Sequence, residues 1–355
     1  MLLVFVTVVL SACDSRERLY VLNWGEYMNP DLIRAFEEEH NVRVIYEEVM
    51  SNEAMENNLK RGTTNYDIMI PSEYMIDKLV QQNLLQPIQK DLLTNYASIE
   101  FFSDARALYE NEPFGDYMIP YFFGTVGIMY NTSNPDIKAA LESQENSGFC
   151  ALFDPESPFI IGLYDSPRDT VGAALKCLGY SASSNVQSEL LEAEELIRGV
   201  TGRADRTLTR FGTDGLKGAV ALGNIDMALV YSGDYFEMIF EYEEEGQAIN
   251  FDFYVPEHSN IWIDAFVIPK ASQNVELAHK FIDFFLDIDN AVENADWVGY
   301  TPVIKEVYRI LVEEYEYDYE HYYPQPEGSS REVYIYISEE HAIELNRILN
   351  AAKAQ

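Results

Sequence analysis

Positive charge, histidine and cysteine are all scarce in this chain of 355 residues. Lys and Arg number 24 against 60 Asp and Glu, which gives a formal net charge of −36 at pH 7. This imbalance argues against nucleic-acid binding, which needs basic patches, and against charge-driven docking on an anionic membrane. A strongly acidic chain is compatible with a cationic ligand, although a solvated acidic surface explains most of these charges.

The scarcity of catalytic side chains argues against an enzyme. The chain has five His and three Cys, with no Cys-x-x-Cys pair, no metal-ligand spacing, no nucleophile elbow and no histidine-based triad. We therefore predict no metal, no cofactor and no catalytic residue. The enzymatic alternative is a set of carboxylates of the kind that hydrolyses glycosides, namely Asp169, Asp264 and Glu332.

An apolar run at residues 1–10 is too short to span a bilayer. It is typical of the hydrophobic region of a signal peptide, and it leads through small residues to Cys13. This pattern resembles the bacterial lipobox, whose Cys thiol is diacylated, so we expect residues 1–13 to be a signal segment with lipidation at Cys13. No Lys or Arg precedes the run, and an ordinary buried N-terminal strand is the alternative interpretation.

The two other cysteines lie in different settings. Cys150 is near a predicted loop, whereas Cys177 lies in an apolar helical run and is expected to be buried. A disulfide between them would suit an exported protein, but the sequence leaves the pairing open.

The first half of the chain alternates strand and helix patterns, and the length suits two domains. Residues 19–24 are rich in aliphatic and aromatic side chains, as in a buried strand. Asn29 is a favourable N-cap, Pro30 is a favourable first helical residue, and residues 42–47 alternate with a period of two. Strand, helix and strand in this order indicate an α/β fold.

Aromatic and acidic side chains follow two of the predicted strands. Trp24, Glu26 and Tyr27 lie at the end of the first strand, and residues 72–74, Ser-Glu-Tyr, follow a strand at 66–71, where the serine is expected to cap a helix. In open α/β sheets, ligands bind at the carboxyl ends of strands. We therefore predict that both groups line one crevice, with ordinary core packing as the alternative for the Trp and Tyr.

Asp264 is the least expected charge in the chain, because it lies within the apolar strand pattern of residues 261–269. A buried charge needs a partner. We expect that partner to be either a ligand cation or a Lys or Arg elsewhere in the chain.

Eight motifs occur in order along the chain: NWGEY (23–27), EVMSNEAM (48–55), YDIMIPSEY (66–74), DSPRDT (165–170), GYS (179–181), WID (262–264), FIDFFL (281–286) and GYTP (299–302). Together they resemble the polyamine-binding proteins of the spermidine and putrescine class, bacterial extracellular solute-binding lipoproteins that serve ABC importers. The resemblance extends from Leu19 almost to the end of the chain, and it is weakest in the tail around Glu332.

The resemblance implies an α/β fold of the two-lobed periplasmic-binding-protein kind, similar to type II. Each lobe is a mixed sheet flanked by helices, the ligand cleft lies between the lobes, and the lobes close around the ligand by hinge motion. It places residues 14–125 and 264–308 in the first lobe, and residues 126–263 and 309–355 in the second.

The same resemblance implies the ligand-binding residues, which are Trp24, Tyr27, Ser72, Tyr74, Asp169, Tyr231, Trp262 and Asp264. Asp169 and Asp264 would each grip an amine, and the aromatic side chains would form the walls. Three positions depart from the family pattern: Ser166 replaces a second acid of some members, Tyr231 replaces a tryptophan, and Glu332 falls where a glutamine occurs. The number of amines that the site prefers therefore stays open.

The implied partners are a polyamine and the membrane permease and ATPase of an ABC importer. The implied location is the periplasm or cell surface, with attachment to a bacterial membrane only through the lipid. The same scaffold could bind another cationic solute or act as a surface sensor or adhesin, because fold does not fix the ligand. Acids and aromatics without an arginine clamp in the cleft favour an amine.

Overall fold

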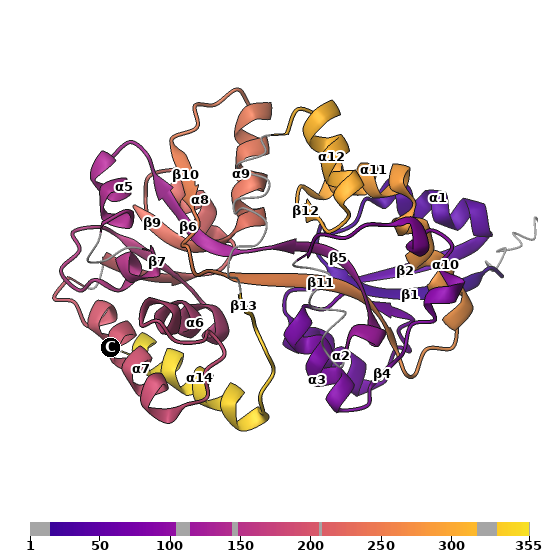
Figure 1. Cartoon of the computed structure of the whole chain (residues 1–355), viewed down its shortest axis with the longest axis horizontal. Coiled ribbons are helices and arrows are strands. Elements are labelled where there is room, and N and C mark those ends of the chain that lie inside the picture. Colours follow the sequence, from indigo (N-terminus) through magenta and orange to yellow (C-terminus); the bar gives the residue numbers. More distant parts are fainter. Residues whose placement is uncertain (1–14, 104–113, 144–147, 206–207, 318–331, 355) are drawn as a thin grey trace, which may run out of the picture.

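The two-lobed α/β architecture is present in a computed structural model, which describes residues 15–103, 114–143, 148–205, 208–317 and 332–354. The strands form two sheets, and the lobes that contain them lie side by side and are joined through the centre (Figure 1). Helices flank each sheet, so the predicted fold class is confirmed. The predicted lipidation site, Cys13, lies outside the described residues.

The larger sheet has eight strands among the described residues. Six follow the order β12-β5-β11-β3-β1-β2, and β4 and β13 each pair with β11. Their bounds are β1 (Glu17–Trp24), β2 (Val42–Val49), β3 (Ile68–Met69), β4 (Leu85–Gln86), β5 (Met118–Gly124), β11 (Asn260–Pro269), β12 (Thr301–Pro302) and β13 (Glu332–Val333). Because β1 is parallel to β2 and β3, the carboxyl ends of these strands reach the same edge of the sheet.

The smaller sheet has the order β10-β6-β9-β7-β8. Its strands are β6 (Val126–Asn131), β7 (Ile161–Tyr164), β8 (Thr209–Gly212), β9 (Met227–Tyr231) and β10 (Phe251–Tyr254). β7 is parallel to both β8 and β9, whereas β6 is antiparallel to β9 and β10. The carboxyl ends of β7 and β9 therefore share one edge of this sheet.

Two extended segments connect the lobes through the centre of the molecule (Figure 1). β5 ends at Gly124 in the larger sheet and β6 begins at Val126 in the smaller one, with the buried Thr125 between them. All ten residues of β11 are buried. A Cβ at Gly124 would lie 2.4 Å from the Trp262 ring, so glycine is what allows the two segments to lie this close.

The helices pack on both sheets. They are α1 (Pro30–His40), α2 (Asn52–Arg61), α3 (Glu73–Gln81), α5 (Pro135–Leu141), α6 (Pro167–Cys177), α7 (Gln187–Thr201), α8 (Gly215–Ala221), α9 (Ser232–Glu244), α10 (Val275–Leu286), α11 (Ile288–Val298), α12 (Lys305–Glu314) and α14 (Glu339–Lys353). Short 3-10 helices occur at Lys90–Leu92, Tyr96–Ser98, Gly115–Tyr117 and Gly148–Phe153. None of the helices in the described part of the chain is long and apolar enough to cross a membrane.

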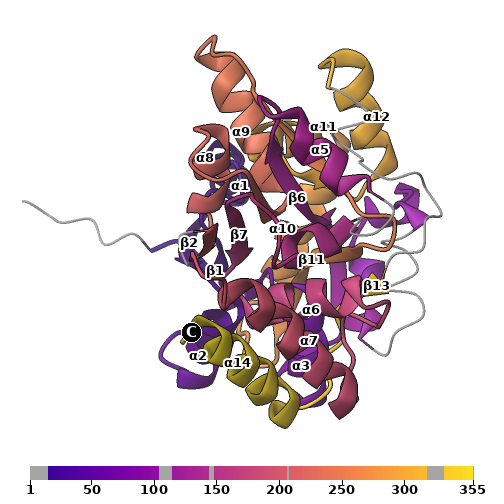
Figure 2. The same cartoon turned by 90° about the vertical axis from the view of Figure 1, so that its left-hand side faces the viewer.

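The C-terminal helix packs on the side of the smaller sheet. Figure 2 shows α14 beside α6 and α7, and the three helices contact one another. Tyr308 lies in the middle of α12, which packs against α11 and β12 on the side of the larger sheet. The lobe boundaries, including the one placed at residue 308, stay a prediction.

Local sequence signals set the helix starts. Asn29 accepts a hydrogen bond from the backbone N–H of Asp31, and Pro30 is the first residue of α1, as predicted. Ser72 occupies the N-cap position of α3, but the prediction that it caps the helix is wrong for its side chain, which makes no capping bond. Its hydroxyl accepts a hydrogen bond from Asn52 Nδ2 at 3.0 Å instead.

A disulfide joins Cys150, in the 3-10 helix Gly148–Phe153, to Cys177 at the end of α6. The two cysteines are 27 residues apart, and closing a loop of this length in the unfolded chain stabilises the fold by about 3.5 kcal/mol in the chain-entropy model.

We expect the double variant Cys150→Ser/Cys177→Ser to lose about this free energy of unfolding. Denaturant unfolding of oxidised and reduced protein provides the check, and equal midpoints would contradict it.

Candidate functional site

The predicted site residues converge between the lobes, where strand ends of the two sheets face each other. The first lobe contributes Trp24, Tyr27, Ser72 and Tyr74, from the ends of β1 and β3. The second lobe contributes Asp169 and Tyr231, from the ends of β7 and β9, and β11 contributes Trp262 and Asp264. We call these eight residues, with Glu73 and Arg168, the interlobe cluster.

Asp264 lies at the centre of the interlobe cluster. The Tyr27 hydroxyl donates to its Oδ2 at 2.9 Å, and Ser72 faces it through a backbone bridge and its hydroxyl. The Oδ1 atom is buried and has no hydrogen-bond partner among the described residues. No Lys or Arg of the described chain lies within ion-pair distance of this carboxylate, so the structure does not supply the internal salt bridge considered as its alternative partner.

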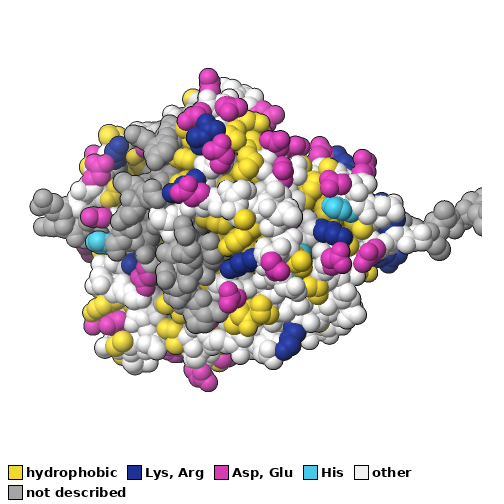
Figure 3. All heavy atoms as spheres, turned by 45° about the vertical axis from the view of Figure 1, so that its right-hand side comes forward, with side chains coloured by type: hydrophobic (Ala, Val, Ile, Leu, Met, Phe, Trp, Pro, Cys, Tyr) yellow, Lys and Arg dark blue, Asp and Glu magenta, His cyan; other side chains and the backbone are white. Residues whose placement is uncertain are grey.

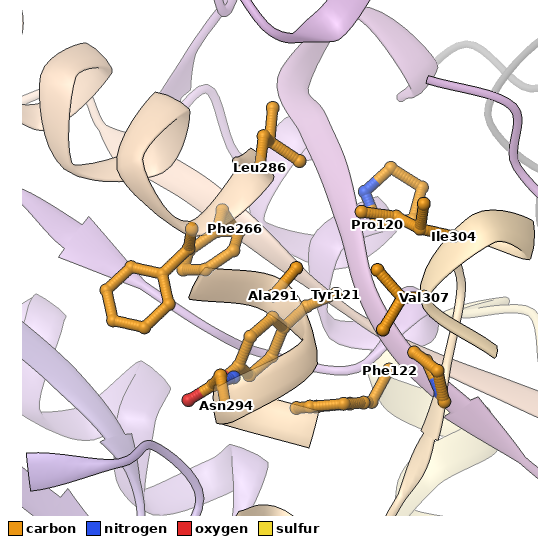
Figure 4. Close-up of a pocket in the computed structure, with 11 residues that line it drawn as sticks. Pro120, Tyr121, Phe122, Phe266, Leu286, Ala291, Asn294, Ile304 and Val307 are labelled. Carbon is orange, nitrogen blue, oxygen red and sulfur yellow. The ribbon is translucent and has the colours of Figure 1, made fainter. Parts of the chain in front are cut away.

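A second layer holds Tyr27 in place. The Tyr121 hydroxyl donates to the Tyr27 carbonyl oxygen at 2.8 Å, and Asn294 Nδ2 donates to the Tyr121 hydroxyl at 2.8 Å. Figure 4 shows Asn294 and Tyr121 beside a cavity of about 20 Å³ within the first lobe. A space of this size holds about one water molecule, so this cavity is too small to be the ligand site.

Glu73 is a member of the interlobe cluster that lies in the segment 72–74, which is predicted to line the crevice, but it is not among the ligand-binding residues that the family resemblance implies. Its side chain comes from the first turn of α3 and is only 1% exposed. Its Oε2 accepts the Ile263 N–H at 2.9 Å, while its Oε1 is buried without a hydrogen-bond partner in the described part of the chain. The sequence signal for Glu73 is its position directly after the predicted strand at 66–71, since ligands bind at the carboxyl ends of strands.

Burial disfavours the ionised form of the Glu73 and Asp264 carboxyl groups. It raises the pKa of Glu73 to about 7, with the Arg168 charge opposing the shift. It raises the pKa of Asp264 to about 6, although hydrogen bonds from Ser72 and Tyr27 favour the ionised form. A cation placed beside them would lower both pKa values, because an opposite charge favours the ionised carboxylate.

The second lobe contributes a third buried acid, Asp169, which lies in the first turn of α6. The Asp169 side chain is 1% exposed, and its Oδ2 accepts from the Tyr231 hydroxyl at 2.8 Å. Its Oδ1 is buried without a hydrogen-bond partner among the described residues and lies 3.6 Å from Arg168 Nε. Arg168 Nη2 donates to the Tyr231 hydroxyl at 3.3 Å.

Arg168 overturns the expectation that no arginine lies at the site. Its guanidinium carbon lies 4.1 Å from the centroid of the Tyr74 ring and 4.8 Å from that of the Tyr334 ring. The residue precedes Asp169 in the first turn of α6, and the sequence could not show that this turn points toward the first lobe. Tyr334, which follows β13, was also not predicted.

Aromatic rings surround the carboxylates. Tyr300 packs edge-on against Tyr27 and Trp262, with ring centroids 5.2 and 5.6 Å apart, and Trp262 lies edge-on to Tyr231. Tyr300 was not predicted as a site residue, although it belongs to the GYTP motif. The indole N–H groups of Trp24 and Trp262 have no hydrogen-bond partner within the described residues.

Two predicted residues, Ser166 and Glu332, have hydrogen-bond partners outside the side chains of the interlobe cluster. Ser166 is the N-cap of α6, where its hydroxyl accepts the Asp169 N–H at 3.4 Å. Glu332 lies on β13 and is bound by residues of the second lobe, because it pairs with Lys176 Nζ at 2.8 Å and accepts the Ala182 N–H at 3.1 Å. Sequence spacing could not show this pairing, since the partners are 156 residues apart.

The charge of the whole chain does not locate the site. Acidic side chains are spread across the face that Figure 3 shows, which fits a solvated acidic surface. In the described residues, no group of three or more His, Cys, Asp and Glu side chains is placed to hold a metal ion. What distinguishes the interlobe cluster is burial of acids among aromatic rings.

Comparison with known proteins identifies relatives over most of the chain. The family model for bacterial extracellular solute-binding proteins matches residues 31–321. The putrescine-binding periplasmic protein SpuD of Pseudomonas aeruginosa is 30% identical over 307 residues, which cover 82% of this chain and 81% of the relative.

Solved structures agree with this result. The spermidine/putrescine ABC transporter substrate-binding protein of Streptococcus pneumoniae has a TM-score of 0.76 and 30% identity, covering 95% of this chain and 99% of that one. A lipoprotein of Treponema pallidum has a TM-score of 0.76 and 26% identity, covering 96% of this chain and all of the other.

Proposed function

Since the chain belongs to the family of bacterial extracellular solute-binding proteins, we propose that it captures a polyamine outside the cytoplasm and delivers it to an ABC importer. The observation that carries the proposal is the buried Asp264 carboxylate, whose Oδ1 has no hydrogen-bond partner among the described residues. A protonated amine is the partner that this oxygen needs. The names of the two polyamine-binding relatives support the same ligand class.

The chemistry of the interlobe cluster suits a polyamine, which is a flexible apolar chain with protonated nitrogens. Asp264, Glu73 and Asp169 offer charge-assisted hydrogen bonds. The rings of Tyr231 and Trp262 offer apolar faces for the methylenes, and each cation–π contact contributes roughly 0.5–2 kcal/mol. A micromolar dissociation constant requires about −8 kcal/mol, which a few such contacts with two ion pairs can supply.

We propose Trp24, Tyr27, Ser72, Tyr74, Asp169, Tyr231, Trp262 and Asp264 as the ligand-binding residues, and we add Glu73. The lobes would divide near residues 124 and 264 and close around the ligand by hinge motion. Neither Ser166 nor Glu332 is required, because both side chains already have partners within the second lobe.

The proposed cellular setting is a lipid anchor at Cys13 and a permease and ATPase as partners. The lipobox-like sequence supports the anchor, as does the relative from Treponema pallidum that is named a lipoprotein. The buried carboxylates act as ligand-binding groups and not as catalysts in this proposal. A surface sensor that detects polyamine by binding it would use the same site.

The direct test is calorimetric titration of residues 14–355 with putrescine, cadaverine, spermidine and spermine. We expect saturable binding of at least one of them with a micromolar or lower dissociation constant, and a higher unfolding temperature of the complex. The amino acid 4-aminobutyrate serves as a control, because Arg168 could also bind a carboxylate. Absence of heat and of any thermal shift with every polyamine would overturn the proposal.

A further inference from the structure

Gly233 lies in the first turn of α9, directly after the strand β9 that ends at the proposed ligand-binding residue Tyr231. It is buried, and it is not one of the glycines with a positive φ in the described part of the chain, so its backbone suits alanine as well as glycine. Alanine is the more favourable of the two within a helix. The reason for a glycine at this position is therefore a contact and not the backbone conformation.

That contact is with the ring of Tyr300. The three heavy atoms nearest to a Cβ added at Gly233 are all ring carbons of Tyr300, and the Cβ would overlap them. Tyr300 lies between the end of α11 and β12 of the larger sheet, whereas α9 packs on β6, β9 and β10 of the smaller sheet. Because Gly233 has no side chain, a ring from the side of the larger sheet lies directly against a helix of the other lobe.

The turn that carries Tyr300 meets α9 a second time. A Cβ at Gly299 would lie 3.2 Å from the Phe240 ring, which comes from the same helix. Two contacts along one helix hold the turn in place, so extra volume at Gly233 is expected to move the Tyr300 ring or the helix.

The neighbours of the Tyr300 ring connect this contact to the interlobe cluster. Its centroid lies 5.2 Å from that of Tyr27 and 5.6 Å from that of Trp262, both edge-on, and each of these two side chains is only 5% exposed. Displacement of the Tyr300 ring would therefore be transmitted to the Trp262 ring and to Tyr27, whose hydroxyl donates to Asp264.

We propose that Gly233 is a positioning residue for ligand binding, which lets the Tyr300 ring lie against α9 and so sets the places of Tyr27 and Trp262 in the interlobe cluster. The inference rests on the proposed polyamine function and deepens it, because it names a contact between the lobes on which the aromatic wall of the site depends. A single methyl group at residue 233 then weakens ligand binding by acting through Tyr300.

The test is a double-mutant cycle of Gly233→Ala and Tyr300→Ala, with Gly199→Ala as the matched control. Gly199 also lies within a helix, α7, but a Cβ added there meets no atom within 4 Å. Calorimetry at a temperature at which every variant is folded gives the dissociation constants of putrescine and spermidine. Thermal unfolding without ligand gives the Tm of each variant.

We expect Gly233→Ala to weaken binding of the tighter polyamine by at least about tenfold, and Gly199→Ala to leave it within about twofold of wild type. Tyr300→Ala removes the ring that the methyl group would displace. Adding Gly233→Ala to Tyr300→Ala should therefore change the dissociation constant by less than about twofold.

Two results overturn the inference and leave the proposed function intact. One is a dissociation constant of Gly233→Ala within about twofold of wild type, even if its Tm falls, because the glycine would then serve folding alone. The other is an equal loss of affinity from Gly233→Ala with and without Tyr300→Ala. Absence of polyamine binding by the wild-type protein overturns the proposed function and the inference together.

The unfolding temperatures decide the matter if Tyr300→Ala binds too weakly to be measured. We expect Gly233→Ala to lower the Tm in the wild-type background, and to leave or raise it in the Tyr300→Ala background, where only the helix preference for alanine acts. An equal fall of the Tm in both backgrounds overturns the inference. If Gly233→Ala alone does not fold, failure of the double variant to fold overturns it in the same way.

Discussion

Replacing Asp264 by Asn is expected to weaken polyamine binding by at least about 30-fold, because removing one partner of a buried charge pair costs about 2–5 kcal/mol. The unliganded protein is expected to be no less stable at pH 7. Burial raises the pKa of Asp264 from 3.8 to about 6, and a shift of two units corresponds to about 3 kcal/mol by which the ionised carboxylate destabilises the fold. Calorimetry and thermal unfolding of the same sample measure both effects.

The matched control is Asp252→Asn. Asp252 lies on β10 and accepts from the Tyr130 hydroxyl at 2.9 Å, as Asp264 accepts from Tyr27, but it lies in the smaller sheet and outside the interlobe cluster. We expect polyamine affinity to be unchanged in this variant. A dissociation constant for Asp264→Asn within a few-fold of wild type would show that Asp264 does not bind the ligand.

Polyamine affinity is expected to fall by about 100-fold between pH 7.5 and pH 5.5, because the ligand requires ionised carboxylates. Glu73, with a pKa of about 7, takes up a proton first, and Asp264, with a pKa of about 6, follows. The amines of the ligand keep their protons throughout, since alkylammonium groups have pKa values near 10. Binding at pH 6 should therefore release protons from the protein.

Stability without ligand should change in the opposite direction. Both acids have folded pKa values above their ordinary values, so the folded state binds protons more tightly than the unfolded state. Their contribution to the free energy of unfolding therefore increases as the pH falls from about 7 to about 4. It is lost as the pH rises through the two folded pKa values.

Titration at pH 6 in two buffers of different ionisation enthalpy measures the number of protons released. Glu73→Gln should remove the part of the pH dependence that lies near pH 7 and keep the part near pH 6. An affinity that stays constant from pH 5.5 to pH 7.5 in the wild-type protein would contradict this assignment of the carboxylates.

The sequence by itself determined the features that depend on neighbouring residues. The Asn29 cap with Pro30 specified the start of α1, because capping involves only adjacent backbone groups. An acid within an apolar strand identified Asp264 as a buried charge in need of a partner. Ordered motifs identified the family, and hence the two-lobed fold.

Only the tertiary structure decided which side chains meet across the lobes. It placed Arg168 between Tyr74 and Tyr334, and it paired Glu332 with Lys176 instead of placing it beside Asp169. It also directed the Ser72 hydroxyl toward Asp264 and away from its helix.

The physical reason is that these contacts join residues far apart in the sequence. Tyr27 and Asp264 are 237 positions apart, and their hydrogen bond exists because β1 and β11 belong to one sheet. The direction of a side chain at a strand end or in a first helical turn depends on how the sheets are packed. Local sequence patterns contain no information about that packing, so they identified candidate binding groups, and the fold decided which of them meet between the lobes.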